Sequence, residues 1–231
     1  MRKGLLRHSK NVHSQNGEDG ILAVIMDRLG VDTGWCVEFG AWDGIHLSNT
    51  FAFVERGWQA VYIEGDAEKF KDLQATAERH PEIHPIEAFV GWEGDAALDR
   101  LLARTEIPKE FDLLSVDVDG DDWHVWNGLT EYRPKVVVIE INSRIPAGVE
   151  QIPGPDAEGA SFTSTVALGR EKGYTPVVHT GNIIFVRDDL VDLVGVDREL
   201  LENPDLMFQD RFITGKIPGL RPAIGRLLGR G

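Results

Sequence analysis

The sequence has one cysteine, no long apolar run and fewer basic than acidic residues. Cys36 is the only cysteine among the 231 residues, so a disulfide within the chain is excluded. Its apolar neighbours predict a buried structural thiol. No apolar stretch approaches the length that spans a bilayer, and residues 4–6 are too short for the core of a signal peptide. We therefore expect a protein of a reducing compartment, the cytoplasm, with no transmembrane segment.

The balance of charge argues against a nucleic-acid partner. The chain holds 24 Lys and Arg against 38 Asp and Glu, for a formal net charge of −14, whereas nucleic-acid affinity comes largely from basic residues that neutralise phosphates. Both ends are nevertheless basic, because no acid precedes Glu18 and none follows Asp210. Solvated termini are the simpler interpretation, and a patch for an anionic substrate or membrane surface is the alternative.

Short apolar runs alternate with amphipathic segments along most of the chain, which is the pattern of βαβ units. We expect strands over residues 35–39, 60–64, 84–90, 111–116 and 136–141, separated by helices over 17–29, 48–56, 67–79, 95–104, 122–129 and 161–172. Residues 174–178 and 182–186 read as a closing antiparallel hairpin. The sequence predicts one α/β domain over residues 1–231, with a Rossmann-like, mostly parallel, doubly wound sheet.

A glycine-rich turn follows the first expected strand, in residues 37–44. Its pattern, Glu38-x-Gly40-x-x-x-Gly44, allows a sharp turn and a close approach of backbone to ligand, and Ala41 inside the turn is predicted to contact the cofactor as well. The spacing differs from the Gly-x-Gly-x-x-Gly of dinucleotide-binding proteins. Glu38 is a natural partner for the ammonium or, through water, the sulfonium of S-adenosylmethionine (SAM).

The second and third expected strands end in residues that suit an adenosine. Glu64 closes the second strand, where a carboxylate can accept both ribose hydroxyl protons. Residues 87–90 close the third, so that backbone meets the adenine edge and an apolar side chain such as Val90 packs on the ring. Core packing explains residues 87–90 equally well.

Four aspartates crowd the end of the fourth expected strand, at the sheet edge where ligands of α/β folds collect. Asp117 and Asp119 share one side if the strand continues, and their repulsion favours a cation, a ligand or a raised pKa. The spacing does not fit an EF-hand. A different oxygen site for Mg²⁺ is predicted from four residues: Asp117, Asp119, Glu140 and Asn142.

The same cluster supplies candidates for catalysis without a metal. Asp119 or His124 could accept a proton from a hydroxyl group, since a perturbed carboxylate and an imidazole both titrate usefully near neutral pH. Asp121 and Asp122 are expected instead to cap the helix that follows and to complement its dipole. The loop over residues 145–159, with three prolines and three glycines, is expected to shape the substrate pocket.

Several blocks of residues, in this order, resemble the FkbM-type family of SAM-dependent methyltransferases. They are residues 14–19 (SQNGED), 37–41, 48–50, 57–58, 63–64, 113–122, 126, 137–142 and 173–174. The resemblance covers residues 14–190 and leaves 191–231 as a C-terminal extension. It implies the class I methyltransferase fold and cofactor contacts at eight positions: Glu38, Gly40, Gly44 and Glu64, with Gln15, Ser48, Asn49 and Asp117.

The resemblance implies O-methylation of a hydroxyl group on a sugar or natural product, with SAM as cofactor. Mg²⁺ is a second candidate cofactor, from the oxygen site described above. Two other functions stay open. One is a SAM-binding module that has lost transfer, and the other is a nicotinamide-dependent oxidoreductase, which the glycine spacing disfavours. The acceptor is expected to be a small hydroxylated molecule, and a homo-oligomer is possible.

Overall fold

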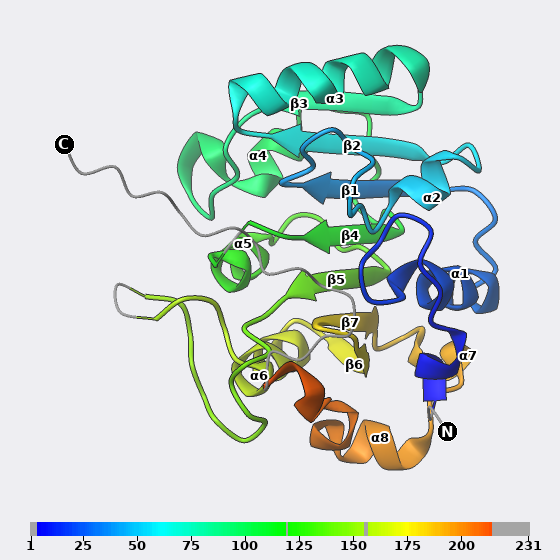
Figure 1. Ribbon diagram of the computed structural model, residues 1–231, viewed down its shortest axis with the longest axis vertical. Helices are drawn as coiled ribbons and strands as arrows, with labels where there is room; N and C mark the ends of the chain where they lie inside the picture. Colours follow the sequence, from blue (N-terminus) through cyan, green and yellow to red (C-terminus); the bar gives the residue numbers. More distant parts are fainter. Residues whose placement is uncertain (1–3, 119, 155–156, 214–231) are drawn as a thin grey trace.

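The computed structural model describes residues 4–118, 120–154 and 157–213 of the chain. Its centre is a seven-stranded sheet with the strand order β3-β2-β1-β4-β5-β7-β6 (Figure 1). The strands are β1 (Trp35–Phe39), β2 (Gln59–Glu64), β3 (Ile83–Glu87), β4 (Leu113–Val116), β5 (Val136–Glu140), β6 (Tyr174–His179) and β7 (Asn182–Arg187).

The first five strands are parallel and the last two run as an antiparallel pair. β7 pairs antiparallel with both β5 and β6, so the final hairpin inserts its second strand beside β5. This confirms the expected fold: a mostly parallel Rossmann-like sheet that ends in an antiparallel hairpin.

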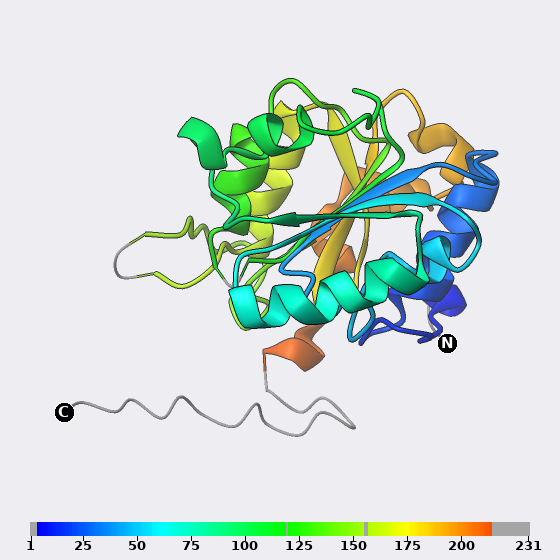
Figure 2. The same ribbon diagram turned by 90° about the horizontal axis from the view of Figure 1, so that it is seen from above.

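Helices cover both faces of the sheet, as Figure 2 shows from above. One buried cluster joins the sheet to α4, α5 and α6, and a second joins its other face to α1, α2, α3 and α7. The helices are α1 (Glu18–Arg28), α2 (Phe51–Val54), α3 (Ala67–Arg79), α4 (Leu98–Leu102), α5 (Asp122–Gly128), α6 (Phe162–Glu171), α7 (Val191–Val194) and α8 (Arg198–Glu202), with 3-10 turns at Gly4–His8, Gly94–Ala96, Pro204–Met207 and Asp210–Phe212.

The burial pattern explains why these segments are strands. β4 is buried along its whole length, and β1, β2 and β5 have a single half-buried residue each, at one end. Strands covered by helices on both faces read as continuous apolar runs, which is what the sequence has there. Cys36 is fully buried in β1, as expected, and burial raises the pKa of its thiol.

Three expected boundaries are wrong. The third strand ends at residue 87, so the chain leaves the sheet before Val90. The helix expected over 95–104 is interrupted at Ala97, whose ψ of 138° is not helical, and only Leu98–Leu102 forms an α-helix. The helix expected over 48–56 shrinks to Phe51–Val54, because the residues before it bond to Glu38 as described below.

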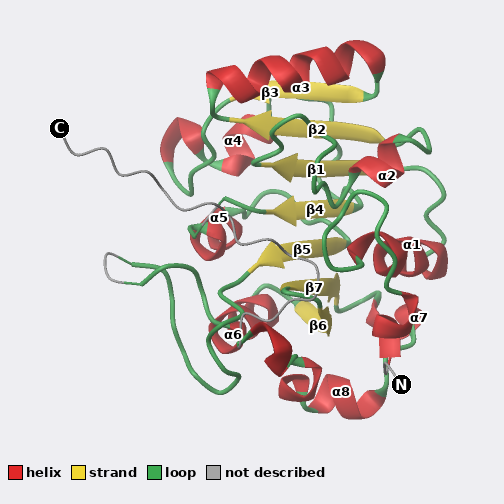
Figure 3. Ribbon diagram, in the orientation of Figure 1, coloured by secondary structure: helices red, strands yellow, loops and turns green. Residues whose placement is uncertain are grey.

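The connection between β5 and α6 extends past the carboxyl ends of the strands (Figure 3). In the part of the chain that the structure describes, no helix combines the length and apolar character needed to cross a membrane.

Candidate functional site

The strand order reverses between β1 and β4, and we call the carboxyl edge of the sheet at this reversal the crevice. From β1 the chain builds outward to β2 and β3 on one side, and β4 and β5 lie on the other side. Ligands of open α/β sheets bind at such a point, outside the carboxyl ends of the strands. The glycine turn after β1 and the aspartate-rich segment after β4 therefore meet at the place where a ligand is expected.

Gly40 brings these two segments into contact. Its φ is 67°, in the left-handed region, and a Cβ added to it would lie 2.3 Å from the carbonyl oxygen of Asp117. A side chain at this position is thus opposed by conformation and by space. Gly44, at φ 78°, is the second tight position, since its added Cβ would lie 3.0 Å from carbons of Leu73 and Tyr62.

Glu64 lies at the carboxyl end of β2 and is bonded to the turn. One carboxylate oxygen accepts the backbone N–H of Trp42 at 2.8 Å, and the other accepts that of Asp66 at 2.8 Å. A carboxylate has about four acceptor sites, so each oxygen of Glu64 keeps capacity for a ligand hydroxyl. The side chain is fixed in place, and the residue is 6% exposed.

Trp42 was missed by the sequence interpretation. It is a non-glycine residue at φ 46°, a conformation that is costly for a bulky side chain, and its N–H is the donor to Glu64. Such strain is found at functional sites more often than elsewhere. The glycine pattern could not reveal it, because left-handed backbone is expected at glycine and Trp42 carries a large side chain.

Two neighbouring residues after β3 differ in exposure. Val90 is partly buried and packs against the core, whereas Phe89 is 77% exposed. The Phe89 ring lies over Gly65, where an added Cβ would come within 2.3 Å of it. Phe89 thus supplies the exposed apolar surface near the end of β2 that was expected from Val90.

Glu38 is buried beneath the turn, 5% exposed, and bonded to its own chain. Its carboxylate accepts the hydroxyls of Ser48 and Thr50, each at 2.5 Å, and the N–H of Asn49 at 2.9 Å. Burial raises the pKa of Glu38, and the Ser48 and Thr50 hydroxyls oppose that rise. Ser48, Asn49 and Glu38, three predicted cofactor contacts, are therefore partners of one another.

Two further predicted cofactor contacts, Ala41 and Gln15, lie outside this network. Ala41 is buried, and its N–H bonds to the carbonyl of Ile63 on β2. Gln15 is exposed, in the loop before α1, and its carbonyl oxygen accepts from the Asn11 side chain at 2.7 Å.

That loop is organised by the two acids of the SQNGED block. One oxygen of Asp19 accepts the N–H groups of residues 12, 13 and 14 and the hydroxyl of Ser14. Glu18 accepts the Thr180 hydroxyl at 2.6 Å, which ties the loop to the turn between β6 and β7. The block therefore places Gln15 at the carboxyl edge of the sheet.

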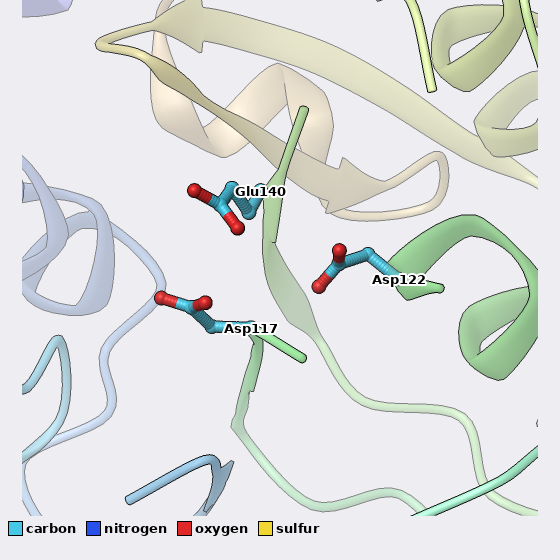
Figure 4. Close-up of side chains that lie close together, drawn as sticks. All are labelled: Asp117, Asp122 and Glu140. Atoms are coloured by element: carbon cyan, nitrogen blue, oxygen red, sulfur yellow. The ribbon is translucent and has the colours of Figure 1, made fainter. Parts of the chain in front are cut away.

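Three carboxylates converge on the other side of the crevice, and we call them the carboxylate trio: Asp117 after β4, Asp122 at the start of α5 and Glu140 at the end of β5. Each contributes an oxygen within 4.8 Å of the others, and Figure 4 shows the groups facing one another. Asp122 is 3% exposed. Its burial first, and the charge of Glu140 second, raise the Asp122 pKa to about 7.

The expectation that Asp121 and Asp122 cap α5 is wrong in the described structure. Asp121 makes no side-chain cap bond, and Asp122 accepts from the N–H groups of Val118 and Gly120, at 2.8 and 3.1 Å. Asp122 thus closes the turn ahead of the helix. The bend brings its carboxylate toward Glu140, which a cap would not require.

The other residues predicted for catalysis or metal binding have different surroundings. Asp119 lies outside the described residues. The Asn142 side chain donates to the carbonyl of Glu158 and accepts from the N–H of Arg144. His124 bonds through Nε2 to the carbonyl of Pro153 at 3.0 Å, between the rings of Trp92 and Trp123. Of the four predicted metal ligands, Asp117 and Glu140 come together, with Asp122 as the unpredicted third member.

A surface hollow of 520 Å³ lies between the glycine turn and α3, lined on one side by Trp42, Asp43 and His46 and on the other by four residues of α3: Asp72, Ala75, Thr76 and Arg79. A crossover helix runs back from the carboxyl ends of the strands, so the second half of α3 leads away from the crevice. The hollow is therefore separate from the carboxylate trio.

No family model matches the chain, and no curated protein matches it. Among solved structures it is similar to the N-terminal domain of EvdMO1 with S-adenosylhomocysteine (SAH) and D-fucose, at 16% identity over 77% of this chain and 84% of that chain, TM-score 0.48.

Two further structures are similar at 12% identity. One is a TehB-like SAM-dependent methyltransferase from Corynebacterium glutamicum (71% of this chain, 86% of that chain, TM-score 0.41). The other is M. jannaschii TYW2 in complex with AdoMet (77% of this chain, 79% of that chain, TM-score 0.44). Each is described as a SAM-dependent methyltransferase or as a complex with SAM or SAH. Likenesses this distant leave the reaction of this chain to be inferred from its own residues.

Proposed function

We propose that this chain is an FkbM-type SAM-dependent methyltransferase that methylates a hydroxyl group of a small sugar or natural product. The observation that carries the proposal is the contact between Glu64 and the strained turn at Trp42, beside the strand-order reversal. A fixed carboxylate with spare acceptor sites at the end of β2 suits the two hydroxyls of a ribose.

The residues present fit the cofactor. Glu64 would accept the ribose hydroxyls, and Phe89 would lie against the adenine, since cofactor sites are mostly apolar with a few placed polar groups. Gly40 and Gly44, which carry no side chain, let the backbone of the turn pack closely against Asp117, Leu73 and Tyr62, so that this backbone would lie at the edge of the crevice. Gln15 would approach from the N-terminal loop.

When bound, the cofactor supplies an activated methyl group for in-line displacement. The chain then has two tasks: to hold the acceptor oxygen in line with that group, and to remove the hydroxyl proton. We assign proton removal to the carboxylate trio, because the raised pKa of Asp122 suits a base near neutral pH. Asp119, two residues after Asp117, stays a candidate for the same role.

Glu64→Gln tests the cofactor site. The substitution removes the charge and one of the acceptor oxygens that serve Trp42, Asp66 and the ribose, so SAM and SAH affinity should fall about a hundredfold. Calorimetric titration measures it. Glu87→Gln is the matched control, because Glu87 ends the adjacent strand in register with Glu64 but is exposed. Equal affinity in wild type and Glu64→Gln would refute the assignment.

The reaction is tested by screening hydroxylated sugars and small natural products for SAH release. Each acceptor is assayed with Mg²⁺ and with a chelator, which decides the Mg²⁺ prediction separately. Activity that survives the chelator assigns proton removal to the carboxylates alone, and activity that depends on Mg²⁺ makes the trio a cation site.

Two outcomes would favour the alternative functions. Binding of SAM with no transfer to any acceptor would favour a SAM-binding module. Binding of NAD in preference to SAH would favour an oxidoreductase, although the glycine spacing of residues 40–44 opposes it.

A further inference from the structure

We propose that Glu38 is a positioning residue: it holds residues 48–50, and through them the width of the crevice between the glycine turn and β4, without touching the cofactor. This inference rests on the proposed function and changes the role that the sequence suggested for Glu38. It follows from three layers of contacts.

The first layer is the carboxylate itself. One oxygen accepts both the Ser48 and Thr50 hydroxyls, and the other accepts the Asn49 N–H. Three consecutive residues thus donate to one side chain. The donors leave little of Glu38 for a ligand, and the residue is nearly inaccessible.

The second layer consists of hydrogen bonds that connect residues 48–50 to α2 and β2. The Ser48 oxygen accepts the N–H groups of Thr50 and Phe51, at 3.1 and 2.9 Å, at the start of α2. Because the Thr50 hydroxyl proton goes to Glu38, the Tyr62 hydroxyl 2.8 Å away must donate to Thr50. A continuous chain of donors therefore runs from β2 through Thr50 to β1.

The third layer reaches β4. The Asn49 side chain donates to the Ser115 hydroxyl at 3.0 Å, and Ser115 pairs with Glu38 in the sheet register. Asp117 follows two residues later, and its carbonyl abuts Gly40. Glu38 therefore fixes Asn49, Asn49 fixes the end of β4, and the end of β4 forms one wall of the crevice.

Glu38→Gln tests this role. A carboxamide has one acceptor oxygen, so it cannot serve the two hydroxyls and the Asn49 N–H together. The ligands are SAH and 5′-methylthioadenosine, which lacks the amino-acid part. We expect affinity for both to fall by the same factor, about tenfold or more. We also expect faster hydrogen exchange at the amides of Asn49, Thr50 and Phe51.

Asp99→Asn is the matched control, because Asp99 on α4 is also buried and also accepts backbone N–H groups and a hydroxyl, those of Thr130 and Glu131. It should lower thermal stability and leave both affinities unchanged. If Glu38→Gln does not fold, Thr50→Val and Thr50→Ser replace it. Valine lacks the hydroxyl and should weaken both ligands, and serine should restore them.

Three results would overturn the proposal. A loss confined to SAH would mean that Glu38 contacts the amino-acid part directly. Unchanged affinity for both ligands, as in Asp99→Asn, would mean that Glu38 serves stability alone. If the wild type binds neither ligand, the proposed function fails, and unchanged exchange of residues 49–51 in Glu38→Gln would then refute the positioning role separately.

Discussion

The two walls of the crevice use carboxylates in opposite ways. On the β1 and β2 side, Glu38 and Glu64 are surrounded by hydroxyl and N–H donors. On the β4 and β5 side, three carboxylates lie close together in the carboxylate trio, and Asp122 also accepts the N–H groups of Val118 and Gly120. Neighbouring hydroxyls oppose the rise in the Glu38 pKa, whereas Glu140 adds to the rise in the Asp122 pKa.

This difference between the two walls matches the roles proposed for them, cofactor binding on the β1 and β2 side and proton transfer on the β4 and β5 side. Carboxylates that are held by donors are fixed in position and suit the shaping of a ligand site. Carboxylates that repel one another hold a proton or attract a cation and suit proton transfer. We therefore expect substitutions on the two walls to affect different quantities.

The largest effect is expected at the trio. Glu140→Gln or Asp122→Asn should lower turnover about a hundredfold or more, the scale of general base catalysis, with little change in SAH affinity. Single-turnover methyl transfer and calorimetry measure the two quantities. Asp121→Asn is the control, since Asp121 is exposed and makes no cap bond. Equal losses of affinity and turnover would contradict the division between the walls.

The next effect is on stability as a function of pH. The Asp122 pKa is about 7 in the folded protein against an ordinary 3.8, so the folded state holds this proton more tightly. The stabilisation from this proton is fully present below pH 3.8 and is lost as pH rises through 7. The stability of wild type relative to Asp122→Asn should fall by up to roughly 4 kcal/mol over that window. Denaturant unfolding at a series of pH values measures the free energy of unfolding of both proteins. If the two proteins show the same dependence on pH, the raised pKa of Asp122 is excluded.

The smallest effect concerns the turn that joins the walls. Gly40→Ala and Gly30→Ala both place alanine at similar φ, 67° and 69°, but nothing lies within 4 Å of an added Cβ at Gly30. Both should lose about 1–2 kcal/mol from the left-handed conformation. Gly40→Ala should lose about 1–3 kcal/mol more through the contact with Asp117, and SAH affinity as well. Equal losses of unfolding free energy would mean that the turn can move.

The sheet and its carboxyl edge were predictable from the sequence because buried parallel strands carry a strong local signal. The apolar runs located the five parallel strands and the hairpin, and their order placed Gly40, Glu64 and Asp117 at one crevice. The start of the helix expected over 161–172 also has a local signal, because serine is a favoured cap and the Ser161 side chain accepts the N–H of Ser164 at the start of α6.

The side-chain partners were not predictable, because they depend on contacts between segments far apart in the sequence. Nothing local distinguishes Glu38, bonded inward to residues 48–50, from an acid that faces a ligand. Likewise, Asp122 has the sequence position of a helix cap, and only its bonds to the N–H groups of Val118 and Gly120 orient it toward Glu140. The exposure of Phe89 and the partial burial of Val90 were also not predicted, because β3 ends three residues earlier than expected.

The central claim is that the crevice between β1 and β4 binds SAM through Glu64. The most direct measurement is calorimetric titration of the wild type and Glu64→Gln with SAH, and of the wild type with NAD. We predict saturable binding of one SAH per chain, strongly weakened in Glu64→Gln, and no binding of NAD. SAH affinity that is absent, or equal in the two proteins, would contradict the claim.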